Sequence, residues 1–162
     1  MTDYTLPFEL HGGARSPATT RCPVKLGLTD GRILSAEIYL LSDVTRPGGV
    51  TNVEATLDDD RDFLPVTIDG RSALVGRDRI RFVEIDAEAP GTSELLELSG
   101  SLDVVSLTFD SGEILSGVLR SPAPAESMRM SDVFNRPGRF LTLTTGDVLV
   151  LVAKAHVVEA SF

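Results

Sequence analysis

The sequence is poor in cysteine, histidine and aromatic residues, and each shortage excludes a class of site. Cys22 is the single cysteine, which rules out an intramolecular disulfide and a cysteine-rich zinc site. The two histidines, His11 and His156, stand far from each other and from Cys22, so we predict no metal site. Tryptophan is absent and there are only two tyrosines. Because single-stranded RNA is held by base stacking on aromatic rings, we do not expect nucleic acid as a partner.

Long apolar runs are missing as well. No stretch approaches the roughly 20 apolar residues of a membrane helix, and residues 1–15 lack the apolar core of a signal peptide. Fifteen Lys and Arg residues stand against 24 Asp and Glu residues, for a net charge of −9, which disfavours a broad attraction to nucleic acid or anionic lipid. We therefore expect a cytoplasmic protein with no membrane segment, and the near absence of cysteine agrees with a reducing compartment.

No catalytic or cofactor motif stands out. The Gly-x-Ser-x-Gly motif of a serine nucleophile is absent, and Gly12-Gly13 and Gly48-Gly49 are too short to cradle a phosphate. The acidic run Asp58-Asp59-Asp60 lacks the spaced ligands of an EF-hand calcium loop, so a solvated turn is the preferred interpretation. These absences predict a protein that is not an enzyme and carries no cofactor.

The sequence does contain an internal duplication. Residues 24–39 align with residues 105–120, with identical residues at Val24, Leu26, Gly31, Ile33, Leu34 and Ser35. Further on, Phe63-Leu64 aligns with Phe140-Leu141, and Leu74-Val75 aligns with Leu151-Val152. The two copies therefore span about 22–85 and 103–162.

Each copy has the pattern of short β-strands joined by tight turns. Alternating apolar and polar residues flank Asp30-Gly31 in the first copy and Ser111-Gly112 in the second, which is typical of a β-hairpin. We predict one helical turn in each copy, at 53–57 and 130–134, and further strands at 63–68, 72–75, 79–85, 140–144, 148–153 and 156–162. The fold class expected is all-β, with two tandem small bent sheets or partly open barrels. Because one copy is too small for a large core, we expect the two to share a face about a pseudo-twofold axis.

The predicted domain organisation has three parts. Residues 1–85 form the first repeat with an N-terminal lead-in strand, 86–102 an acidic connector, and 103–162 the second repeat. The connector contains no Lys or Arg, and its leucines, Leu95, Leu96, Leu98 and Leu102, indicate that part of it packs as a strand.

Three motifs in the second copy carry a family resemblance: Ser131-Asp132-Val133-Phe134-Asn135, Arg139-Phe140-Leu141-Thr142-Leu143 and Leu151-Val152-Ala153-Lys154-Ala155-His156-Val157. The copy resembles a small uncharacterised bacterial β-domain family with SDFLN-like, RFLPL-like and LVNKAHI-like segments. The first copy keeps Asp62-Phe63-Leu64-Pro65-Val66 and departs at 56–59. The short bent sheet is also similar in shape to the Sm-like barrel class. The resemblance implies a fold and no known activity.

The candidate binding residues are cations that recur in corresponding places of the two copies: Arg77, Arg79, Arg139, Lys154 and His156. Arg77 and Arg79 correspond to Lys154 and His156, and residues at i and i+2 of a strand share a face. Each repeat is therefore predicted to present a small basic patch. The preferred alternative is that these cations pair with Asp78, Asp62 and the acidic connector.

Together these observations predict a non-enzymatic interaction or regulatory adaptor. It would bind a segment of a partner protein through an exposed sheet edge or through the paired basic faces. One alternative is a sensor in which Arg77, Arg79 and Lys154 hold a small anionic ligand between the repeats. Another is a self-assembling structural subunit, a homo-oligomer whose sheet edges join copies of the chain.

Overall fold

The computed structural model describes residues 20–40, 52–89, 103–120 and 129–162. Within these ranges the chain forms ten antiparallel strands in one open sheet, together with two short α-helices. The predicted all-β class is confirmed. No helix in the described part is long and apolar enough to cross a membrane. The predicted lead-in strand and most of the acidic connector lie outside the described residues.

The first half of the sheet, residues 20–89, follows the predicted order of elements. It contains β1 (Thr20–Leu28), β2 (Ile33–Leu40), α1 (Asn52–Leu57), β3 (Phe63–Ile68), β4 (Arg71–Gly76), the 3-10 helix η1 (Arg77–Arg79) and β5 (Ile80–Asp86). The second half, residues 103–162, contains β6 (Asp103–Phe109), β7 (Ile114–Leu119), α3 (Met130–Phe134), β8 (Phe140–Thr145), β9 (Val148–Ala153), the 3-10 helix η2 (Lys154–His156) and β10 (Val157–Ser161). The two predicted helical turns and both predicted hairpins are confirmed.

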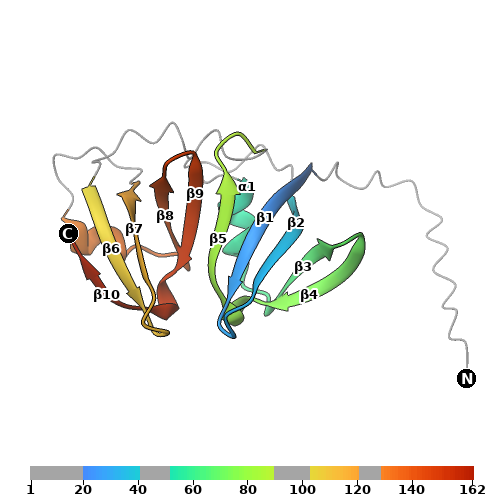
Figure 1. Cartoon of the computed structure of the whole chain (residues 1–162), viewed down its shortest axis with the longest axis horizontal. Helices are drawn as coiled ribbons and strands as arrows, with labels where there is room; N and C mark the ends of the chain where they lie inside the picture. Colours follow the sequence, from blue (N-terminus) through green and yellow to red (C-terminus); the bar gives the residue numbers. More distant parts are fainter. Residues whose placement is uncertain (1–19, 41–51, 90–102, 121–128) are drawn as a thin grey trace, which may run out of the picture.

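The strands are arranged in the order β10-β6-β7-β8-β9-β5-β1-β2-β3-β4 (Figure 1). Each half contributes five neighbouring strands, and the order is the same in both when β1–β5 are matched with β6–β10. Residues that align in the duplication also have aligned partners across the ladder. Examples are Leu26 with Leu34 against Leu107 with Leu115, and Phe63 with Gly76 against Phe140 with Ala153.

The halves are joined by antiparallel pairing of β5 with β9, which places Phe82 opposite Val152 and Asp86 opposite Val148. β5 is the last strand of its half in chain order, whereas β9 is the fourth strand of its own half. A twofold axis would bring together strands of equal position, because both partners would use the same surface. The described sheet therefore does not show the predicted pseudo-twofold relation. The joint is head to tail.

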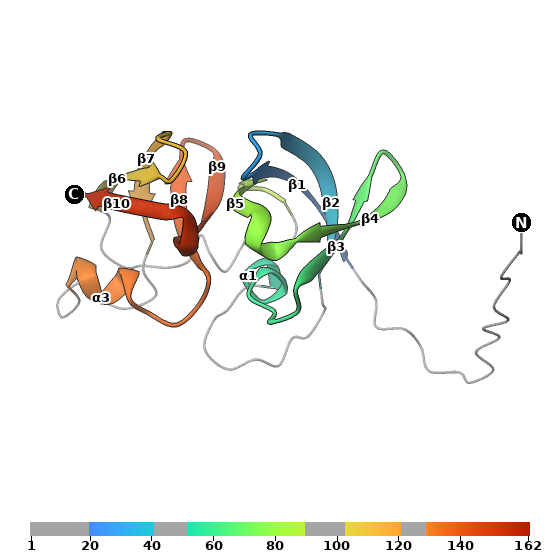
Figure 2. The ribbon, with the colours of Figure 1, turned by 90° about the horizontal axis from the view of Figure 1, so that it is seen from below.

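The apolar interior is shared across this joint. The core beneath β1–β5 includes Phe140, Leu151 and Ala153 of the second half, and Phe82 of the first half packs on the core of the second. Helix α1 adds Val53 and Leu57 to the first core, and α3 adds Val133 to the second. Figure 2 shows both helices on the same side of the sheet. Because each half contributes apolar side chains to the core of the other, packing at the joint stabilises both halves.

Candidate protein interaction edges

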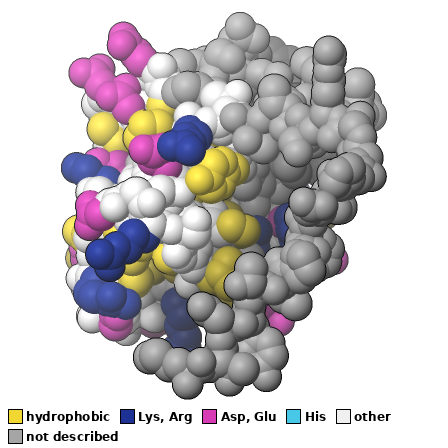
Figure 3. Space-filling view, turned by 90° about the vertical axis from the view of Figure 1, so that its right-hand side faces the viewer, with side chains coloured by type: hydrophobic (Ala, Val, Ile, Leu, Met, Phe, Trp, Pro, Cys, Tyr) yellow, Lys and Arg dark blue, Asp and Glu magenta, His cyan; other side chains and the backbone are white. Residues whose placement is uncertain are grey.

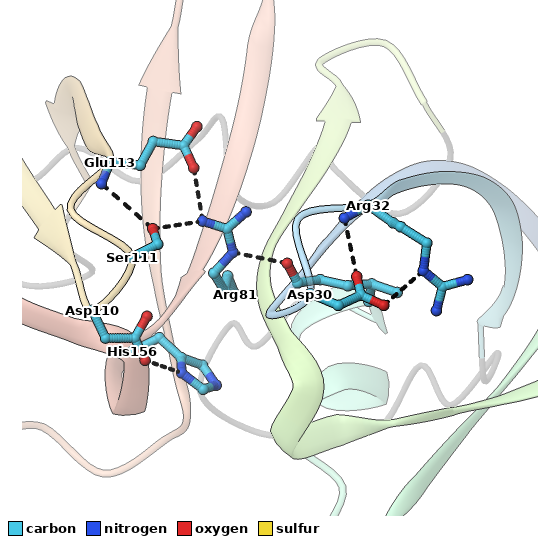
Figure 4. Close-up of polar contacts among 8 residues, drawn as sticks. Asp30, Arg32, Arg81, Asp110, Ser111, Glu113 and His156 are labelled. Atoms are coloured by element: carbon cyan, nitrogen blue, oxygen red, sulfur yellow. Dashed lines mark hydrogen bonds and ion pairs between the residues drawn. The ribbon is translucent and has the colours of Figure 1, made fainter.

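Arg81 is the central polar residue of the joint between the halves (Figure 4). Its side chain, on β5, is only 6% exposed. The Nε atom donates to the carbonyl oxygen of Leu28 at 3.0 Å, and Nη1 donates to Ser111 Oγ at 2.9 Å and to Glu113 Oε2 at 2.7 Å. The guanidinium carbon also lies 5.8 Å from the ring centres of Phe82 and Phe109. A buried cation with this many partners fixes β5 against the β6–β7 turn.

His156 also lies at the joint rather than on an open face. Its Nδ1 lies 2.9 Å from Asp110 Oδ2, and its Nε2 lies 2.8 Å from the carbonyl oxygen of Asp78 in the first half. The hydrogen bond with His156 holds the pKa of the Asp110 carboxyl below its usual value. This side chain therefore bridges the two halves.

Arg139 makes two contacts with the first half. Its backbone N–H donates to Asp58 Oδ1 at 2.9 Å, and its guanidinium lies 3.9 Å from the Asp78 carboxylate. Burial raises the pKa of the Asp58 carboxyl, while the Arg139 N–H and the charge of Lys154 oppose the shift. The alternative predicted from the sequence, in which these cations pair with acids such as Asp78, is confirmed for Arg139.

Arg77 and Lys154 occupy corresponding places, and the side chain of each donates to backbone carbonyl oxygens near the end of a helix. Arg77 is buried, and its Nη1 donates to the carbonyl oxygens of Thr56 at 2.9 Å and Leu57 at 2.8 Å, at the end of α1. Lys154 Nζ donates to the carbonyl oxygen of Arg136 at 2.5 Å, just after α3. Carbonyl groups at the C-terminal end of a helix lack hydrogen-bond donors within the helix, and a cationic side chain can donate these bonds instead.

The expectation that each pair of cations shares one strand face was wrong. Residues 77–79 and 154–156 form 3-10 helices instead of strands. With about three residues per turn, side chains at i and i+2 point in different directions. Arg77 is buried as a result. Arg79 is exposed, its carbonyl oxygen accepts from the Thr29 N–H, and its side chain makes no hydrogen bond or ion pair with the described residues.

Sequence reasoning missed two residues of the joint, Arg81 and Asp58. The duplication contained a signal for Arg81, because the aligned residue of the second copy is the apolar Val158. Asp58 was assigned to a solvated turn with its neighbours. That assignment holds better for Asp59, which faces the Arg61 side chain at 2.5 Å, and Arg61 holds the pKa of Asp59 well below its usual range.

An open hollow of about 620 Å³ lies over β1, β2 and β5. Its lining contains four carboxylates, Glu37, Asp69, Glu84 and Asp86, and the single cation Lys25. Such a lining repels a small anion. Among the described residues, no three His, Cys, Asp or Glu side chains converge as metal ligands.

The outer edges of the sheet, β4 and β10, each have a strand neighbour on one side only within the described part. Apolar side chains are exposed on or beside them: Leu74 is 67% exposed, Phe63 55% and Val158 70%. An unpaired strand edge presents free N–H and C=O groups to another chain. These edges are therefore the candidate interaction surface, and we call β4 with the neighbouring Phe63 the β4 edge.

A hollow of about 480 Å³ lies beside the β4 edge. Leu28, Leu34, Ile68 and Val75 form part of its apolar lining, and Thr29, Asp30, Arg32 and Arg79 form its polar and charged lining. Figure 3 views this end of the molecule, where apolar side chains reach the surface between basic and acidic ones. The surface can therefore accept an apolar side chain beside an extended backbone.

The chain matches no family model, no curated protein and no solved structure.

Proposed function

We propose that the protein is a non-enzymatic interaction adaptor that binds an extended segment of a partner through the β4 edge. The observation that carries this proposal is an outer strand, unpaired on one side in the described part, with exposed Leu74 beside a partly apolar hollow. A partner segment would add a strand to the sheet, so that main-chain hydrogen bonds provide affinity and side-chain pockets provide specificity.

The residues at the edge define the chemistry of the segment. Part of the wall of the hollow is apolar, and this part fits an aliphatic or aromatic side chain. The guanidinium of Arg79 lines the hollow and has no ion-pair partner among the described residues, so an acidic residue of the segment would pair with it. A segment with an apolar anchor and an acidic neighbour is the expected ligand.

Two further parts of the proposal concern the relation between the halves and the location of the protein. We propose that the halves are tandem copies of one small β unit of the Sm-like class, similar to the bacterial domain family that the sequence resembles. The identical strand order and matching registers of the halves support this. The expected cytoplasmic location is part of the same proposal.

The alternative of an anion sensor needs Arg77, Arg79 and Lys154 to face one ligand. In the described structure Arg77 donates to carbonyls of α1, and Lys154 donates to the carbonyl of Arg136. These contacts favour the edge over the basic residues as the interaction surface.

The proposal is tested by capture from native cell extract, with the full chain compared with Leu74→Glu and Val104→Glu. Val104 is 68% exposed and lies on β6 opposite Val118 of β7, in the other half of the sheet from β4, so its variant is the matched control. We expect a protein that is retained by the wild-type chain and by Val104→Glu and is lost on Leu74→Glu. Hydrogen exchange should then show new protection of the β4 amides in the complex.

Two results would overturn the proposal. One is that the extract yields no specific partner. The other is that every captured protein binds Leu74→Glu as well as it binds the wild-type chain. Loss on Arg79→Glu with Lys154→Glu, while Leu74→Glu still binds, would move the interaction to the basic residues.

A further inference from the structure

The joint between the halves is formed by two strands, and each of these strands has a counterpart in the other half that is not paired in this way. Inside the chain, β9 of the second half pairs with β5 of the first. The strand corresponding to β9 in the first half is β4, and the strand corresponding to β5 in the second half is β10. These two strands are the outer edges of the sheet.

We propose that β10 of a second copy of this chain pairs antiparallel with the β4 edge, in the register of the β5–β9 joint. The inference rests on the proposed edge function and names its partner. Transferring the register of β5 and β9 places Glu159 opposite Val75, Ala160 opposite Leu74 and Ser161 opposite Ala73. The contact is heterologous, so repetition gives a closed ring or an open filament according to the rotation between copies.

Two apolar residues of the β4 edge are exposed, and the corresponding residues of the second half are buried at the joint. Phe63 is 55% exposed, whereas its counterpart Phe140 is 8% exposed and belongs to the core of the opposite half. Leu74 is 67% exposed, whereas its counterpart Leu151 is fully buried in that same core. A second copy at the β4 edge would cover Phe63 and Leu74 in the way that the first half covers Phe140 and Leu151.

The hollow beside β4 corresponds to a place that the internal joint fills. At the joint, Arg81 and Phe82 of β5 pack on Phe109, and Arg81 also bonds Ser111 and Glu113. The counterparts of those three partners are Leu28, Asp30 and Arg32, and all three line the hollow. The counterparts of Arg81 and Phe82 are Val158 and Glu159, which are both exposed on β10. Val158 would enter the hollow, and Glu159 would pair with the guanidinium of Arg79. Arg32 is already paired with Asp30 at 2.7 Å.

The purified full chain tests the inference through its mass in solution. Edge contacts are small, so sedimentation should be followed from roughly 10 µM to 1 mM, the range of weak interfaces. We expect the average mass of the wild-type chain and of the control Val104→Glu to rise with concentration. Leu74→Glu should weaken association by at least about tenfold, because it places a carboxylate in an apolar contact. A wild-type chain that stays monomeric throughout would overturn the inference.

Disulfide capture tests the register. A Leu74→Cys chain is mixed with an Ala160→Cys chain under mild oxidation, because directly opposed residues of antiparallel strands lie within disulfide reach. The native Cys22 does not compete, since it is fully buried and burial raises the pKa of its thiol to about 11. We expect the mixed disulfide to exceed both homodimers, and a Val104→Cys chain to give no such excess with Leu74→Cys. Equal yields from the two mixtures would overturn the proposed pairing.

The outcomes separate this inference from the function on which it rests. If the chain is monomeric but a foreign protein is captured in a way that Leu74→Glu abolishes, the edge function stands and the second-copy partner is wrong. If Leu74→Glu changes neither self-association nor capture, both are wrong.

Discussion

The joint between the halves and the outer edge of β10 use corresponding strands with different chemistry. At the joint β5 presents Arg81, which is buried and bonded to Leu28, Ser111 and Glu113. At the same step β10 presents Val158, which is 70% exposed. A buried cation with three acceptors makes the joint specific to one partner surface, whereas an apolar residue on an open strand is suited to a reversible contact. Corresponding strands thus present different side chains where one is covered and the other is an outer strand.

The largest difference in stability is expected when the corresponding leucines of β9 and β4, Leu151 and Leu74, are truncated to alanine. Leu151→Ala removes a fully buried side chain that lies in the core of the opposite half, and should lower the free energy of unfolding by about 2–5 kcal/mol. Leu74→Ala removes a side chain that is 67% exposed, and should change this free energy by about 0.5 kcal/mol or less. Urea unfolding followed by circular dichroism measures both at a concentration where the wild-type chain is monomeric. Equal effects would show that β9 and β4 have the same surroundings.

The next comparison is between Arg81 and Val158. Arg81→Ala removes the hydrogen bonds of a buried guanidinium and opens space between Phe82 and Phe109, although the Leu28 carbonyl keeps its bond from the Gly31 N–H. The free energy of unfolding should therefore fall by about 2–4 kcal/mol. Val158→Ala should lower it by about 0.5 kcal/mol or less, since the side chain is exposed. The same unfolding experiment measures both.

Glu113→Gln is the control that isolates charge in this comparison. The Glu113 side chain is 56% exposed, and Arg81 keeps its bonds to Leu28 and Ser111 when Glu113 is neutral. The expected loss is therefore about 1 kcal/mol or less. If Glu113→Gln cost as much as Arg81→Ala, the ion pair rather than the buried guanidinium would hold the joint.

The smallest effect expected is on the pH dependence of stability. Burial and the neighbouring charge of Asp58 raise the pKa of Glu54, although the charge of Arg136 opposes them. The folded chain thus holds this proton more tightly than the unfolded chain, and the free energy of unfolding should fall as pH rises above the ordinary Glu value through the raised one. Glu54→Gln should make that fall shallower, with a gain of about 1 kcal/mol or less at neutral pH. Urea unfolding from about pH 2 to pH 8 measures it.

Asp110→Asn tests a carboxyl group whose pKa is lowered, in contrast to the raised pKa of Glu54. His156 lowers the pKa of Asp110, so the stability that this carboxylate contributes is present above the ordinary Asp value and is lost as pH falls through the lowered one. The variant should flatten the acid side of the profile and leave the fall above it unchanged. If Glu54→Gln left the fall unchanged too, the raised pKa of Glu54 would have no part in it.

Strands, turns and helical turns could be predicted from the sequence because they depend on local patterns. Alternation around Asp30-Gly31 and Ser111-Gly112 predicted hairpins that the structure contains, and both glycines adopt the positive φ that such turns require. The surroundings of Arg77 and His156 could not be predicted, since a 3-10 helix of three residues has no pattern that separates it from a strand start. Their partners, the carbonyls of α1 and Asp78, are also distant in sequence.

The sequence by itself determined the ten strand segments and the two hairpins at Asp30-Gly31 and Ser111-Gly112. The order of the strands in the sheet came from the tertiary structure. Only the tertiary structure decided which edge is covered. Phe63-Leu64 and Phe140-Leu141 are identical dipeptides in matching ladders, yet Phe63 is exposed and Phe140 is buried. The physical reason is that burial at a strand edge depends on whether another strand pairs there. β9 is covered by β5, whereas β4 has no second strand neighbour in the described part.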